Sequence, residues 1–128
     1  MKMVKIFFKW ADKHIFLVKV VAVIWVAMIV ILCLMPSSNL PNKIEISFLD
    51  KIAHFTFYFV LSLFMLLIFK IPKWTKRIFL LIFLLFCFSL FIEVMQLIMP
   101  WERSFSGADL IANLSGIIVG VIIFPKNL

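Results

Sequence analysis

Apolar residues form four long stretches along this 128-residue chain, separated by short segments rich in polar residues or proline. The stretches are about residues 15–35, 50–69, 78–99 and 106–124. Each contains about 20 residues, the length an α-helix needs to cross a hydrocarbon core about 30 Å thick. Pro36, Pro100 and Pro125 follow three of them and would end a helix there. The pattern predicts an all-α fold, a bundle of four transmembrane helices.

Residues 1–14 differ from the rest because lysines alternate with aromatic residues. Two interpretations remain open: a short amphipathic helix on an anionic membrane surface, or simply the positive flank of the first span. We therefore divide the chain into a basic segment, residues 1–14, and one four-helix membrane domain, residues 15–128. The polar segment from Ser37 to Ser47, which contains Pro41, is predicted to be a loop.

Basic residues predict the orientation of these spans. Ten fall on one side of the predicted membrane: Lys2, Lys5, Lys9, Lys13, Lys19, Lys70, Lys73, Lys76, Arg77 and Lys126. Three fall on the other: Lys43, Lys51 and Arg103. Because positive residues collect in cytoplasmic loops, both termini are predicted to be cytoplasmic and the loops 36–49 and 100–105 to face outward.

Composition supports a membrane location and excludes several other classes. Hydrophobic residues make up 66% of the chain, charged residues only 15%, and the mean hydropathy is +1.21. An ordinary soluble domain does not have this composition. The net charge of +7 is explained by orientation, so we expect no nucleic-acid partner. Cys33 and Cys87 lie in apolar stretches, which favours buried thiols, and no cofactor motif is visible.

Polar residues in the second and third spans repeat at helical spacing. His54, Tyr58 and Ser62 are each four residues apart, so they share one helix face. Ser89, Glu93 and Gln96 share a face in the third span. Glu93 is the most informative of these residues, because placing an acidic group inside a span costs about 2.5–3.5 kcal/mol on insertion scales.

The fourth span carries two neighbouring stripes. The polar one consists of Ser106, Asp109 and Asn113 and continues into two glycines. The second contains only small residues, Ala108, Ala112, Gly116 and Gly120, and is typical of close helix packing. It leaves open a structural role in which a partner helix or a second copy of the chain docks there.

All three polar faces are predicted near the outward ends of their helices, in the outer half of the membrane. A channel or proton relay needs polar groups across the whole depth, so this pattern argues against one. It predicts an outward-facing polar pocket. The candidate ligand-binding residues are Asp50, Lys51, His54, Tyr58, Glu93, Gln96, Arg103, Ser104, Ser106, Asp109 and Asn113.

Three motifs in this order resemble the VanZ-like family of bacterial membrane proteins. They are Asp50-Lys51-x-x-His54-Phe55-x-x-Tyr58, Glu93-x-x-Gln96, and Arg103-Ser104-Phe105-Ser106-x-x-Asp109-x-x-x-Asn113-x-x-Gly116. Leu34-Met35-Pro36 also resembles the family, and the similarity covers roughly residues 34–120. The family usually has Pro-Gly-Arg before the serine, whereas this chain has Pro-Trp-Glu-Arg.

The resemblance implies a small multi-pass protein of the bacterial cytoplasmic membrane. The family's name comes from a member linked to low-level resistance to teicoplanin, a lipid-tailed glycopeptide that acts outside that membrane. The resemblance does not imply an established biochemical activity, nor does it imply that this chain confers resistance.

Our leading functional hypothesis is a cell-envelope protein that binds a lipid or lipid-linked headgroup in the outward pocket. Lys51 and Arg103 would meet a phosphate, the polar side chains would meet hydroxyl or amine groups, and the apolar spans would contact acyl or prenyl chains.

The alternative is a membrane-embedded transferase or hydrolase acting on a lipid-linked substrate. His54 would be the general base, with Glu93 or Asp109 as acid or orienting partner. Ser104 or Ser106 is a candidate nucleophile, although no recognised elbow motif surrounds either. One histidine with two carboxylates at this spacing is a weak metal signal, so we predict neither a metal site nor a cofactor.

Overall fold

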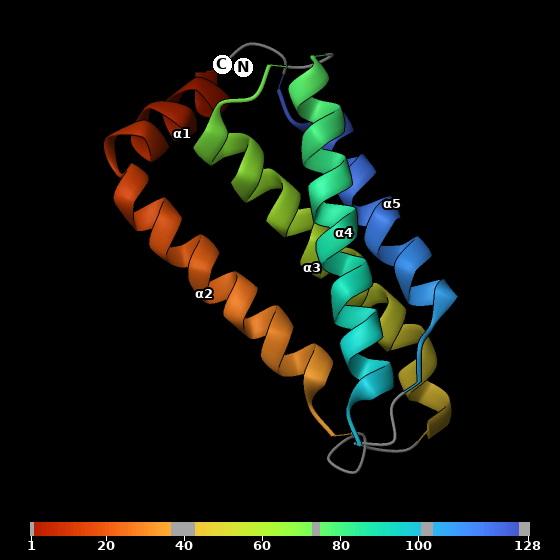
Figure 1. Ribbon diagram of the computed structural model, residues 1–128. Coiled ribbons are helices and arrows are strands. Elements are labelled where there is room, and N and C mark those ends of the chain that lie inside the picture. Colours follow the sequence, from red (N-terminus) through yellow and green to blue (C-terminus); the bar gives the residue numbers. More distant parts are fainter. Residues whose placement is uncertain (1, 37–42, 73–74, 101–103, 126–128) are drawn as a thin grey trace.

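The computed structural model describes residues 2–36, 43–72, 75–100 and 104–125 (Figure 1). In these ranges the chain forms five α-helices and no strand. The helices are α1 (Lys2–Lys13), α2 (Ile15–Leu34), α3 (Lys43–Phe69), α4 (Lys76–Ile98) and α5 (Gly107–Ile123). The predicted all-α fold is confirmed for the described part of the chain.

Three of these helices are long and apolar enough to cross a membrane: Ile15–Leu34, Phe48–Phe69 and Lys76–Ile98. The fourth predicted span corresponds to α5, an apolar helix of 17 residues, which falls below that length. The bounds of α2, α4 and α5 lie within two residues of the predicted spans. Three long apolar helices fit a membrane protein, and the fourth span stays a prediction.

The loop predicted from Ser37 to Ser47 is wrong over its second half, because α3 begins at Lys43. The physical reason is local: α3 contains no proline or glycine, so nothing after Pro41 interrupts helical hydrogen bonding. We placed the start of the second span at the edge of its apolar stretch, and the helix extends beyond that edge. α3 is consequently the longest helix, with 27 residues.

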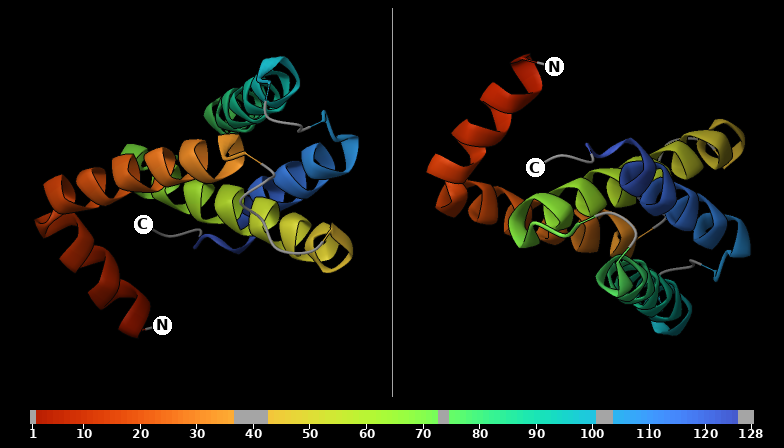
Figure 2. Two further views of the ribbon diagram at one scale, coloured as in Figure 1. Left: turned by 90° about the horizontal axis from the view of Figure 1, so that it is seen from below. Right: turned by 90° about the horizontal axis from the view of Figure 1, so that it is seen from above.

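The basic amino-terminal segment is a helix, α1, and its position on a membrane surface stays a prediction. A bend at His14 turns α1 away from the axis of α2 (Figure 2). Ala11 is fully buried, and the ring of Phe8 packs edge-on against Phe124, with ring centroids 5.6 Å apart. Asp12 pairs with Lys70 at 2.9 Å on the surface. These contacts hold α1 against the end of the bundle that carries both termini.

The tightest helix pair is α3 with α5. A Cβ atom built at Gly116 would overlap the carbonyl oxygen of Phe55, and one at Gly120 would overlap the hydroxyl of Ser62. Only glycine allows the two backbones to approach this closely. This approach brings the polar faces of α3 and α5 together.

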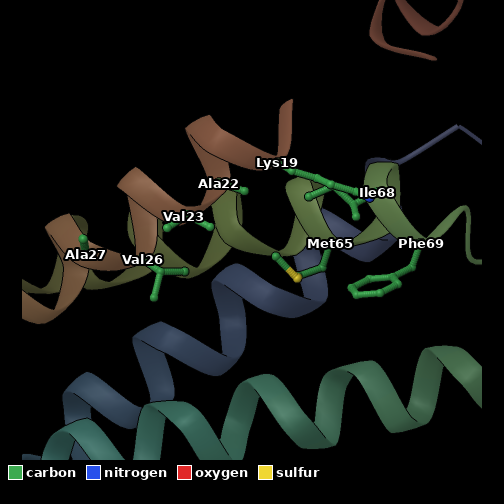
Figure 3. A pocket seen from close by; sticks show the side chains of 8 residues that line it. All are labelled: Lys19, Ala22, Val23, Val26, Ala27, Met65, Ile68 and Phe69. Atoms are coloured by element: carbon green, nitrogen blue, oxygen red, sulfur yellow. The ribbon is translucent and has the colours of Figure 1, made fainter. Parts of the chain in front are cut away.

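α2 is attached to the bundle along one side. The indole of Trp25 donates a hydrogen bond of 3.0 Å to the Phe57 carbonyl. α2 and α4 approach each other at the end opposite the termini, which we call the distal end, and diverge towards the other end (Figure 1). Towards the end that carries the termini, an apolar groove lies between α2 and α3. It is lined by Lys19, Ala22, Val23, Val26, Ala27, Met65, Ile68 and Phe69 (Figure 3). Lys19 is its only charged lining residue, as expected of a lysine that extends its apolar stem along such a surface.

Candidate functional site

Polar side chains gather where α3, α4 and α5 meet in the distal half of the bundle. We call this group the distal polar cluster: Asp50, His54, Ser89, Glu93, Ser106, Asp109 and Asn113. His54, Glu93 and Asn113 are each at most 2% exposed, and Ser89 is fully buried. The sequence placed these polar faces at the same end of three helices. The packing of α5 on α3 and α4 brings them into contact.

Asn113 joins the three helices through its amide. Its oxygen lies 3.0 Å from Nδ1 of His54 on α3, and its nitrogen donates to the Ser89 hydroxyl on α4 at 2.7 Å. Since the amide nitrogen faces Ser89, the oxygen must accept from His54. Nδ1 of His54 therefore carries a hydrogen, and a neutral ring keeps its lone pair on Nε2.

The start of α5 is shaped by Glu93. Ser106 is the N-cap of α5, and its hydroxyl accepts a hydrogen bond of 3.2 Å from the Asp109 backbone N–H. In a capping box, the acidic residue at the third helical position bonds back to the N-cap N–H. Here Glu93, from α4, accepts that N–H instead, at 3.1 Å. The Asp109 carboxylate is left to point into the bundle.

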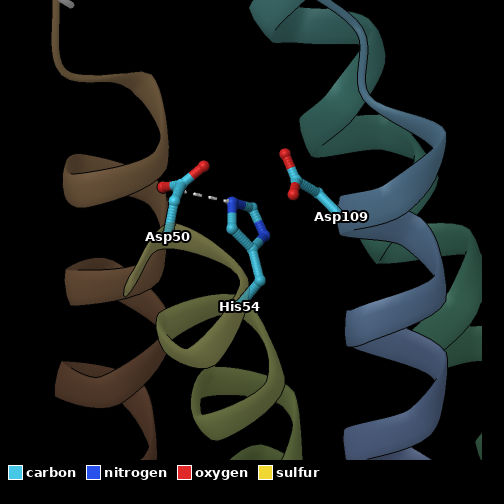
Figure 4. A group of neighbouring side chains, drawn as sticks. All are labelled: Asp50, His54 and Asp109. Carbon is cyan, nitrogen blue, oxygen red and sulfur yellow. Dashed lines mark ion pairs between the residues drawn. The ribbon is translucent and has the colours of Figure 1, made fainter. Parts of the chain in front are cut away.

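Three carboxylates surround the imidazole of His54. Nε2 lies 4.0 Å from Oδ1 of Asp50, one helical turn earlier on α3, and Nδ1 lies 4.0 Å from Oε1 of Glu93. Asp109 approaches from α5, so that one ligand atom each from Asp50, His54 and Asp109 lie within 4.8 Å of one another (Figure 4). Asp50 is 31% exposed, so solvent reaches the cluster at this edge.

Three buried polar atoms among the described residues make no hydrogen bond with the protein: the Tyr58 hydroxyl, Oε1 of Glu93 and Oδ1 of Asp109. Leaving a buried polar group unpaired costs about 1–3 kcal/mol, and more when it is charged. Two of these atoms belong to carboxylates, so the cluster has unmet capacity to accept hydrogen bonds. It can therefore hold a ligand that donates hydrogen bonds or carries positive charge.

Other predicted site residues lie elsewhere. The Gln96 amide donates a hydrogen bond of 2.7 Å to the carbonyl of Cys33 and so connects α4 to α2. This carbonyl is one of the last four of α2, which have no partner within the helix. Ser104 is exposed and Lys51 is half-buried on α3. Arg103 lies outside the described residues.

The small-residue stripe of α5 divides into two parts. Gly116 and Gly120 lie against α3, whereas Ala112 is half-buried and Ala108 is exposed.

Ser89, in the cluster, and the Cys33 carbonyl, outside it, were not among the candidates chosen from the sequence. Ser89 lies one helical turn before Glu93, and this spacing was a visible signal that it shares the polar face. The Cys33 carbonyl bonded by Gln96 is a backbone group, and nothing in residue types could have revealed it.

Comparison with protein families, curated proteins and solved structures gave one match. A family model described as VanZ/LLP1 matches residues 3–127, which is nearly the whole chain. The searches of curated proteins and of solved structures found no match. The match is independent of the geometry above and agrees with the resemblance carried by the three polar motifs. The chain therefore belongs to the VanZ/LLP1 family.

Proposed function

We propose that this chain is a multi-pass protein of the bacterial cytoplasmic membrane, with four spans, both termini in the cytoplasm and the distal polar cluster facing outward. The ten-to-three distribution of basic residues supports this orientation. The 17 residues of α5 extend about 26 Å at 1.5 Å per residue. That is close to the hydrocarbon thickness of about 30 Å, and slight local thinning of the bilayer accommodates the difference.

We further propose that the distal polar cluster binds the polar headgroup of a lipid or lipid-linked envelope molecule. The observation that carries this proposal is the pair of buried carboxylate oxygens with no hydrogen-bond partner, on Glu93 and Asp109. Both residues are more than nine-tenths buried, where an unpaired acceptor is expensive. A headgroup rich in hydroxyl or amine groups would supply the donors that the protein lacks.

The surroundings of the cluster suit a ligand with a lipid tail. Large apolar side chains are exposed on the helices that form it, among them Phe91, Leu97 and Ile111. A tail would lie against these surfaces in the outer leaflet while the headgroup reaches the cluster past Asp50. Lys51, half-buried next to Asp50, would lie close to a phosphate linking the two parts.

Glu93→Gln tests this proposal with little disturbance of the fold. The amide oxygen of glutamine still accepts from the Ser106 N–H, but the negative charge is removed. We expect the purified variant to keep its thermal stability and to lose most of the lipid that co-purifies with the wild-type protein, measured by mass spectrometry. Ser115→Ala is the control, since Ser115 is exposed and bonds only its own helix at Ile111. Unchanged lipid content in Glu93→Gln and in Asp109→Asn would refute the proposal.

A lipid-tailed glycopeptide has the same combination of tail and polar group, so binding of teicoplanin follows as a special case. Expression of the chain in a susceptible bacterium should then raise the inhibitory concentration of a lipid-tailed glycopeptide more than that of an untailed one. Equal effects on both would remove the glycopeptide from the set of ligands and leave the lipid proposal in place.

One observation favours catalysis as the second candidate. His54 has its Nδ1–H held by Asn113 and its Nε2 directed towards Asp50, an arrangement suited to a general base. The chain would then be a transferase or hydrolase acting on the bound headgroup. Turnover of lipid-linked substrates by the purified protein, abolished in His54→Ala, would support this function. Retention of lipid without turnover would leave binding as the function.

A further inference from the structure

We propose that Asp50, His54 and Asp109 form a binding site for a divalent transition-metal cation of the zinc class. The proposal goes beyond the headgroup hypothesis, with which it shares Asp109 and its unpaired oxygen, and binding of an ion can be measured separately from binding of lipid. The sequence spacing was only a weak metal signal, from which no metal site was predicted. The fold does, because α5 carries Asp109 to the face of α3 on which Asp50 and His54 lie one turn apart (Figure 4).

The imidazole is already held as metal-binding histidines are held. In such sites one ring nitrogen binds the metal while the other donates to an oxygen that fixes the ring and its tautomer. His54 donates through Nδ1 to the Asn113 amide oxygen at 3.0 Å, and Asn113 is itself oriented by Ser89. Nε2, the nitrogen nearer Asp50, is the one that would bind the ion.

A second observation also indicates a ligand. Asp109 is 7% exposed, points towards His54, and has a buried carboxylate oxygen without a hydrogen-bond partner among the described residues. The carboxylate was directed there because Glu93, rather than Asp109, completes the cap of α5. A cation between Asp50 and Asp109 would supply a partner for the buried oxygen of Asp109, where an unpaired charge is costly.

The donor set selects the ion. Two carboxylate oxygens and one imidazole nitrogen suit zinc, manganese or ferrous iron, whereas calcium and magnesium prefer oxygen alone and cuprous ions prefer sulfur. With neutral His54, the two aspartates balance the charge of one divalent ion. Three protein ligands leave a fourth tetrahedral position open for water or a ligand oxygen.

The present spacing is wider than that of a formed site. Ligand atoms in a tetrahedron with metal distances of about 2.0–2.1 Å are about 3.3 Å apart, whereas here Nε2 of His54 lies 4.0 Å from Oδ1 of Asp50. Binding would therefore draw the ligands inward. The side chain of Asp50 can make this movement because it is the most exposed of the three and lies at the edge that an ion would enter.

The test is titration of the purified chain, stripped with a chelator and held in lipid nanodiscs, with Zn²⁺ by calorimetry at neutral pH. We expect one ion per chain and a higher unfolding temperature with Zn²⁺ present. Asp109→Asn and His54→Ala should weaken binding by more than about 100-fold, and Asn113→Leu by about 10–100-fold, as expected for a group that orients a ligand. Asp50→Asn is included because Asp50 is partly exposed. This variant should therefore fold even if the variants at the buried residues do not.

Two matched controls lie far from the site on or beside α1. His14→Ala removes the other histidine, and Asp12→Asn removes an aspartate that pairs only on the surface. Both should bind Zn²⁺ as the wild type does. Co²⁺ in place of Zn²⁺ should give the visible absorption of a four-coordinate site, and this signal should disappear in Asp50→Asn. Absence of saturable binding by either ion, or equal loss in the controls and the site variants, would overturn the proposal.

Discussion

Asn113 is the one residue of the described chain that hydrogen-bonds side chains on two other helices at once, His54 on α3 and Ser89 on α4. Asn113→Leu keeps a similar branched shape but removes both bonds, so that the His54 Nδ1–H loses its acceptor and the Ser89 hydroxyl oxygen loses its donor. We expect the free energy of unfolding to fall by about 1–3 kcal/mol. The measurement is reversible unfolding in mixed micelles, followed by circular dichroism.

Ser115→Ala is the matched control for this change, because Ser115 lies on the same helix and bonds only the Ile111 carbonyl of its own helix. It should alter the free energy of unfolding by less than about 0.5 kcal/mol, as surface substitutions usually do. If Asn113→Leu were as stable as this control, the contacts of Asn113 would contribute nothing to the packing of the three helices.

At the scale of the element, the contact between α3 and α5 depends on Gly116. Gly116→Ala would place a methyl group against the Phe55 carbonyl and the Phe59 backbone nitrogen, neither of which can rotate away. We expect the helices to separate slightly and the free energy of unfolding to fall by about 1–3 kcal/mol, the usual cost of overpacking. The polar cluster should loosen as well, because the same approach brings Asp109 to His54.

Gly107→Ala provides the comparison on the same helix, since a Cβ atom there meets nothing within 4 Å. Its unfolding free energy should stay within about 1 kcal/mol of the wild type, with any gain due to the higher helix propensity of alanine. Equal effects of the two substitutions would mean that Gly116 acts through backbone flexibility rather than through close packing.

Helices were the part of the fold that the sequence predicted well, because a 20-residue apolar stretch allows few alternatives. The residues Ser89, Glu93 and Asn113 were recognisable as polar faces for the same reason. What could not be predicted is which polar atom meets which. That depends on how far each helix is rotated and on backbone contacts such as Gln96 with the Cys33 carbonyl, which residue types do not encode.

α1 presents an apolar face that the bundle covers only in part, since Met3 and Phe7 line a groove shared with α3 and α5. Met3, Ile6, Phe7 and Trp10 are all exposed at the spacing of one helix face, while Phe8 and Ala11 pack inward. We expect this outer face to lie in the membrane interface, with Lys9 towards water. In a chain with both native cysteines replaced by serine and placed in liposomes, Ile6→Cys should resist a water-soluble thiol reagent and Lys9→Cys should react. Equal reactivity would show that α1 does not lie on the lipid.

At the scale of the whole molecule, polarity is distributed unequally along the bundle. Buried charged groups lie in the distal half, where His54, Glu93 and Asp109 meet, while the groove near the other end is apolar except for Lys19. Such a bundle has no continuous polar path among its described residues, so it does not have the internal lining of a channel. It has instead one polar end, and the function of that end depends on which side of the membrane it faces.

Orientation can be measured in intact cells with three variants, each carrying one introduced cysteine. In all three, the native cysteines are replaced by serine. Ser104 lies exposed beside α5 at the distal end, whereas Lys70 and Lys9 are exposed at the end that carries the termini. If the distal end faces outward, Ser104→Cys should react with a reagent that cannot cross the membrane. Lys70→Cys and Lys9→Cys should then react only after the cells are permeabilised. Because Phe124, at the carboxyl end of α5, packs against Phe8 of α1, the same pattern would place the two ends of α5 on opposite sides of the membrane. The reverse pattern would place Glu93 and Asp109 on the cytoplasmic side and would exclude an extracellular headgroup as the ligand.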